Sequence, residues 1–79
     1  MKTPRNINGA ALADHLVRNW GYRKVHQTGS HIHLRTDQPS GQTTIVPAHR
    51  PVKPGTLNGI LKHVARHKRV AIDELLRGL

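Results

Sequence analysis

The shortness of the chain and its lack of cysteine place the tightest limit on what it can fold into. A chain of 79 residues has room for one domain with one small hydrophobic core, so we expect a single domain over residues 1–79. Without cysteine, disulfides, thiolate metal sites and cysteine nucleophiles are all excluded. A domain of this size is only marginally stable alone, so a partner that buries part of its surface would stabilise it.

The charge of the chain is its strongest global signal. Thirteen Lys and Arg residues against four Asp and Glu give a net charge of +9, spread over the whole length. A folded domain with this balance attracts polyanions, above all nucleic acid. No apolar run approaches the ~20 residues that cross a bilayer. A signal peptide has an apolar stretch after its positive charges, and the start "MKTPRNINGA" has none. We therefore expect a cytoplasmic protein without membrane contacts.

The first element predicted is a helix in "NGAALADHLVRNWG". Leu12, Leu16 and Trp20 follow one another at steps of four, which places them on one helical face. Asn8 is a suitable N-cap, and Gly21 is a suitable residue to end the helix.

Three short strands are predicted next, in "YRKVHQ", "HIHLRT" and "QTTIVP". The turns "TGS" and "DQPSG" separate them, which favours an antiparallel meander. If Ile32 and Leu34 face the helices, strict alternation places three side chains on the opposite, open face: His31, His33 and Arg35. Alternation in the neighbouring strand suggests that Tyr22, Lys24 and His26 share this open face.

The second half of the chain predicts helices. After the irregular "AHRPVKPG", a helix is capped by Thr56 or has Pro54 in its first turn. Its apolar positions have helical spacing: Leu57, Ile60, Leu61 and Val64. The same spacing in "VAIDELLRGL" predicts a third helix with Ile72, Leu75, Leu76 and Leu79. The fold class is therefore α+β, with helices on one face of a three-stranded antiparallel sheet.

The histidines raise a choice between metal binding and acid–base chemistry. His31, His33 and His49 could hold zinc together, and His63 and His67 are i, i+4 neighbours on a helix. The chain has only four carboxylates that could serve as metal ligands, and its surface is strongly positive. Both features disfavour a metal site, so no metal and no cofactor are expected. Metal-free RNA cleavage needs fewer protein groups than a metal site does, because the ribose 2′-OH is an internal nucleophile. A histidine can move its proton, and Lys or Arg can stabilise the developing charge.

Four segments in order make the chain resemble the HicA family of bacterial toxins. They are a helix ending in "NWGY", a "GSH" after the first strand, "VPAH" at the end of the third, and "KPGTLNGILK" opening the next helix. The resemblance implies a double-stranded-RNA-binding-domain-like α-β-β-β-α fold, here with an additional C-terminal helix. It also implies a ribosome-independent mRNA interferase that acts on mRNA and is inhibited by a HicB-like antitoxin. His31 occupies the family's catalytic position, whereas His33 stands where the family usually has an apolar residue.

The expected site therefore has one principal residue and several supporting ones. His31 is the catalytic residue, and Gly29 and Ser30 form the turn that presents it to RNA. Lys24 and Arg35 are the nearest residues for phosphate contacts, with Arg23 and Lys53 in reserve, and His33 and His49 are possible secondary site residues. Further basic residues add RNA affinity: Lys62, Arg66, Lys68 and Arg69. The competing function is a non-catalytic RNA-binding module, and DNA binding ranks third because no helix has a recognition pattern for the major groove.

Overall fold

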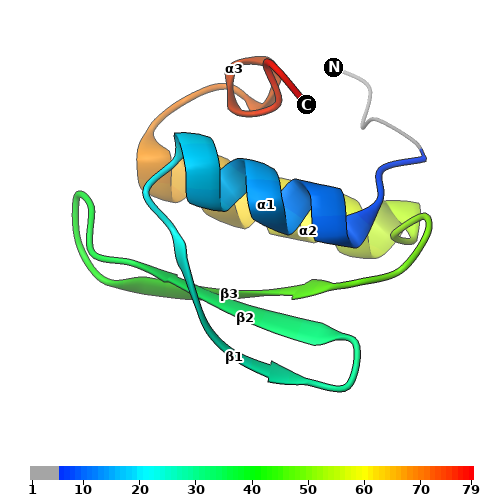
Figure 1. Ribbon diagram of the computed structural model, residues 1–79. Helices are drawn as coiled ribbons and strands as arrows, with labels where there is room; N and C mark the ends of the chain where they lie inside the picture. Colours follow the sequence, from blue (N-terminus) through cyan, green and yellow to red (C-terminus); the bar gives the residue numbers. More distant parts are fainter. Residues whose placement is uncertain (1–5) are drawn as a thin grey trace.

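The computed structural model describes residues 6–79, and the charged start of the chain (residues 1–5) lies outside this range. Six elements follow in the order α1 (Gly9–Asn19), β1 (Arg23–Thr28), β2 (His31–Thr36), β3 (Gln42–Pro47), α2 (Pro54–Lys68) and α3 (Ile72–Leu75). Figure 1 shows α1 in front of α2, both on the same side of the sheet, with α3 on the side of the helices away from the sheet. The predicted α+β class and the α-β-β-β-α order are confirmed.

Both ends of α1 form as predicted. The Asn8 side chain accepts hydrogen bonds from the backbone N–H groups of Ala10 (2.9 Å) and Ala11 (3.3 Å), which satisfies donors that have no partner inside the helix. Gly21 follows the C-cap with a φ of 72°, a conformation that glycine adopts without steric cost.

The sheet is a meander in the order β1-β2-β3, antiparallel throughout. Ile32 and Leu34 of β2 are buried under the helices, as predicted, and Thr36 of the same strand is buried with them. Helix α1 contacts β2 and β3, and helix α2 contacts β3, whereas β1 lies at the edge with all six residues exposed. The turn from β1 to β2 has two residues, and Gly29 adopts a φ of 57° there.

The predicted face of Tyr22 and Lys24 is wrong. Regular alternation would place Lys24 and His26 on one face, but a β-bulge lies between them. Lys24 therefore pairs with Leu34 on the helix side, while His26 pairs with His33 on the open face. The extra residue in a bulge breaks the two-residue period locally, and this reverses the faces. Tyr22 is 3% exposed and belongs to the core.

The ends of the later helices also differ from prediction. Thr56 is not a cap, because α2 already begins at Pro54, after the N-cap Lys53; this was the alternative prediction. Proline suits this position because the first helical residues need no hydrogen-bonded N–H. Helix α3 has only four residues, so the predicted helical spacing does not extend to Leu79, which is 48% exposed.

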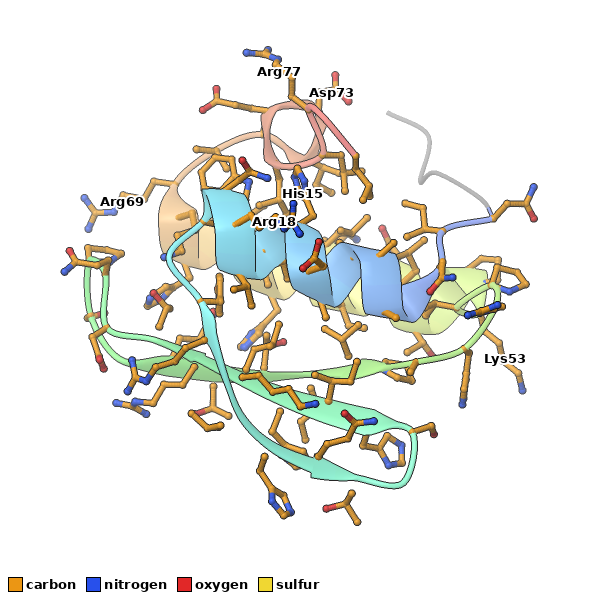
Figure 2. The ribbon with its side chains drawn as sticks, in the orientation of Figure 1. His15, Arg18, Lys53, Arg69, Asp73 and Arg77 are labelled. Atoms are coloured by element: carbon orange, nitrogen blue, oxygen red, sulfur yellow. The ribbon has the colours of Figure 1, made fainter. Side chains whose placement is uncertain are left out.

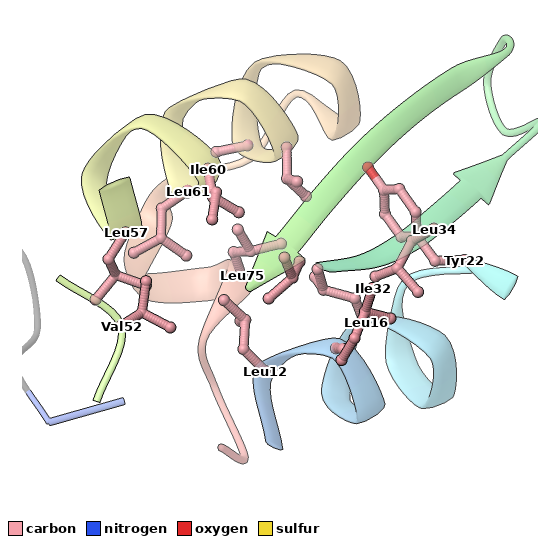
Figure 3. Close-up of a cluster of buried hydrophobic side chains, with 14 residues drawn as sticks. Leu12, Leu16, Tyr22, Ile32, Leu34, Val52, Leu57, Ile60, Leu61 and Leu75 are labelled. Carbon is pink, nitrogen blue, oxygen red and sulfur yellow. The ribbon is translucent and has the colours of Figure 1, made fainter. Parts of the chain in front are cut away.

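The core lies between the sheet and the two long helices, and α3 closes it from the other side. Figure 3 shows Leu75 of α3 among the leucines of α1 and α2. The carbonyl of Leu75 accepts hydrogen bonds from the buried His15 Nε2 (2.7 Å) and from Trp20 Nε1 (2.9 Å). These two bonds fasten α3 to α1. No helix in the part of the chain that the structure describes is long and apolar enough to cross a membrane.

Candidate functional site

His31 is the first residue of β2 and opens onto a pocket of about 240 Å³. The pocket is lined by His31, Pro47, His49, Val52, Lys53 and Thr56. Its polar groups come from three parts of the chain: the start of β2, the segment after β3 and the first turn of α2. Two histidines, a lysine and a threonine therefore lie around one small space.

Backbone hydrogen bonds hold the segment of residues 48–53 in this position. Ala48 N–H donates to the carbonyl of Ser30 (2.6 Å), and Val52 N–H donates to that of Ile7 (2.9 Å). The Val52 side chain is buried in the core. Because irregular segments lack regular hydrogen bonding, these contacts are what fix His49 and Lys53 next to β2. Figure 2 shows Lys53 at this end of the molecule, where β3 leads into α2.

Ser30 and Gly9 support His49 from two sides. Ser30 Oγ lies 3.4 Å from His49 Nε2, a long contact between the two side chains. Gly9 N–H donates to the backbone carbonyl of His49 (3.0 Å). A Cβ at Gly9 would lie 1.8 Å from the carbonyl oxygen of Pro47, so only glycine permits this approach of α1 to β3.

The open face of the sheet is a separate surface. There His33 pairs with His26 at 5.3 Å between ring centroids. Asp37 binds both neighbouring arginines, Arg23 through Nη1 (2.8 Å) and Arg35 through Nε (3.2 Å). The hydrogen bond from Arg23 and the charges of both arginines hold the pKa of Asp37 below its usual value. Arg35 therefore already has a carboxylate partner.

The shared carboxylate predicts a pH effect on the open face. In the folded chain Asp37 should titrate below the ordinary value of about 3.9, and Arg23→Gln should raise its pKa toward that value. A depressed pKa stabilises the fold above about pH 3.9, and this contribution is lost as the pH falls through the folded-state pKa. An NMR titration of the Asp37 carboxyl carbon measures both values. The same pKa in both proteins would contradict the assigned cause.

The remaining predicted residues are divided among different surfaces. Lys24 lines a groove of about 420 Å³ between α1 and β1, which shares no lining residue with the His31 pocket. Lys68, expected to add RNA affinity, donates instead to Thr36 Oγ1 (2.9 Å) and to the carbonyl of Gln38 (2.6 Å). Its Nζ also lies 4.8 Å from the centre of the Tyr22 ring. Burial lowers the pKa of the Lys68 ammonium group, and its two hydrogen bonds tie α2 to the end of β2 and the turn that follows it.

The structure thus brings together His31, His49 and Lys53 and keeps His33, Arg35 and Lys24 away from their pocket. Thr56 and Gly9 are the residues that sequence reasoning missed. No local signal could have found them, because Thr56 resembled a helix cap and Gly9 an ordinary first helical residue. Within residues 6–79, no three His, Asp or Glu side chains gather closely enough to hold a metal ion.

A family model described as "HicA toxin of bacterial toxin-antitoxin" matches residues 14–65, well over half of the chain. The matched range includes all the polar residues of the His31 pocket. No curated protein and no solved structure matches the chain.

Proposed function

Since the chain belongs to the HicA family and is thus a toxin of a toxin–antitoxin system, we propose that it is a metal-independent endoribonuclease. It cleaves mRNA with His31 as the catalytic histidine and thereby inhibits translation. Its inhibitor is a HicB-like antitoxin. We assign residues 1–79 to one toxin domain that acts in the cytoplasm, where its mRNA substrate is found.

One observation carries this proposal: His31 at the start of β2 meets His49 and Lys53, from the segment between β3 and α2, at one pocket. Cleavage of RNA by its own 2′-OH needs a group that takes the proton of the nucleophile and a group that protonates the leaving 5′ oxygen. It also needs positive charge near the phosphate, whose negative charge grows in the transition state. Two imidazoles and one ammonium group can meet these needs without a metal.

The roles of the residues follow from their chemistry. His31 moves a proton, as base for the 2′-OH or as acid for the 5′ oxygen, and we assign the opposite step to His49. The 2′ oxygen forms a bond to phosphorus while the bond to the 5′ oxygen breaks, which leaves a 2′,3′-cyclic phosphate. Lys53 Nζ stabilises the phosphate oxygens. Gly29 and Ser30 shape the turn that presents His31, and Ser30 orients His49 through their contact.

A cleavage assay tests the proposal. Purified protein is mixed with a defined single-stranded RNA, with and without EDTA, and the products are analysed for cyclic phosphate ends. Cutting that survives EDTA is expected. Cutting that EDTA abolishes and zinc restores would overturn the metal-free mechanism. RNA binding without any cutting would leave the competing function, a basic RNA-binding module.

A further inference from the structure

We propose that a basic groove along α2 binds the phosphates of the RNA strand on one side of the bond cut at His31. This inference rests on the proposed function and extends its substrate site. The groove has a volume of about 460 Å³ and lies between α2 and the start of β3. It is lined by Gln42, Gly59, Lys62, His63, Arg66 and His67.

Hydrogen bonds across the groove make it a fixed feature of the fold. Gln42 Nε2 donates to the carbonyl of His63 (3.1 Å). His67 Nε2 donates to the carbonyl of Ser40 (2.8 Å), and His63 Nε2 lies 3.4 Å from that of Thr43. At Gly59, an added Cβ would meet nothing within 4 Å, so space remains open above the helix. The groove is therefore held in shape before any ligand enters.

The charge of the groove is not neutralised by neighbouring acids. Asp14 pairs with Arg18, Asp37 pairs with Arg23 and Arg35, and the other two acidic residues, Asp73 and Glu74, lie on α3. None of them lines the groove. Lys62 and Arg66 are exposed and make no ion pair within residues 6–79. Two unpaired cations in an open groove are suited to a polyanion.

The groove continues the His31 pocket along one face of the same helix. Thr56 lines the pocket, and Gly59, His63 and Arg66 follow it at intervals of three or four residues, the spacing of one helical face. The ten residue steps from Thr56 to Arg66 span about 15 Å at 1.5 Å per step. An RNA strand whose scissile phosphate lies at His31 therefore brings its next phosphates close to Lys62 and Arg66. This continuity favours RNA over an acidic antitoxin segment as the occupant.

RNA binding as a function of salt tests the groove. The Lys62→Ala/Arg66→Ala double variant is made in full-length His31→Ala protein, so that the labelled single-stranded RNA stays intact. Each lost phosphate contact reduces the slope of log affinity against log salt by about 0.7, so we expect a change of about 1.4. If binding is equal near 1 M salt, this corresponds to about 25-fold weaker binding at 0.1 M.

A matched variant separates the groove from net charge alone. Arg18→Ala/Arg77→Ala also removes two positive charges, but from α1 and from the C-terminal segment after α3 (Figure 2), neither of which lines the groove. We expect this control to lose much less affinity and less slope than the groove variant. All four side chains are exposed, so both double variants should keep the thermal unfolding midpoint of the parent, which is checked first.

The outcomes distinguish this inference from the proposed function. If wild-type protein cuts RNA but the groove variant binds RNA as its parent does, the groove inference is wrong and the function stands. If wild-type protein cuts nothing, the proposed function fails, while the salt slopes still decide about the groove. If the groove variant keeps its affinity for RNA but no longer binds the antitoxin, the groove is a protein-binding site and the inference is overturned.

Discussion

Replacing His31 by alanine is expected to lower the rate of RNA cleavage by about 10²–10⁴-fold, the usual contribution of one general acid or base. The side chain is exposed, so the free energy of unfolding should change by no more than about 0.5 kcal/mol. Initial cleavage rates on a defined RNA, together with thermal unfolding of both proteins, measure the two quantities. Loss of activity with an intact fold would assign the proton transfer to His31.

His33→Ala is the matched control, because His33 lies on the same strand only two residues away. Its ring lies beside His26 on the open face, and it does not line the pocket of His31. We expect this variant to cut RNA at nearly the wild-type rate. If His33→Ala loses as much activity as His31→Ala, the reacting phosphate lies on the open face, and the pocket assignment is wrong.

The structural positions of residues whose partners are close in sequence were predictable. The cap of α1 depends on Asn8 and the two N–H groups just beyond it, and its end depends on Gly21. The buried side of β2 follows from alternation alone. In such cases the local pattern and the tertiary packing favour the same structure, and the prediction is confirmed.

The face of Lys24 was not predictable, because its position depends on a bulge. No glycine or proline marks the break at Val25, so the segment "YRKVHQ" gives the same pattern as a regular strand. One extra residue was enough to move Lys24 and Tyr22 to the helix side. The sheet face expected for RNA therefore has Arg23 in place of Lys24, and Asp37 binds this arginine.

The pocket itself depends on contacts between distant residues. His31 and His49 are separated by the whole of β2 and β3, and the chain path that joins them ends in an irregular segment. Sequence patterns identified both histidines as candidates but could not place them in one pocket. Their approach depends on β2–β3 pairing and on the bonds that anchor residues 48–53 to Ser30 and Ile7.

Gly9→Ala is expected to destabilise the fold by about 3 kcal/mol or more, because the new Cβ would overlap a backbone atom that has little freedom to move. The Cβ would lie 1.8 Å from the carbonyl oxygen of Pro47 and 2.8 Å from its carbonyl carbon. The end of β3 or the start of α1 must then move. For a domain of this size the loss corresponds to a decrease of about 12 °C or more in the unfolding midpoint.

Gly59→Ala is the control for this substitution, because it places the same methyl group on a helix where nothing lies within 4 Å. Alanine is the better helix former by about 0.5–1 kcal/mol, so this variant should unfold at a higher temperature than wild type. Because Gly9 N–H also holds the carbonyl of His49, the Gly9→Ala protein should lose cleavage activity at temperatures where it is still folded. Equal unfolding midpoints for the two variants would contradict the close contact between α1 and β3, and with it the contacts that hold His49 at the His31 pocket.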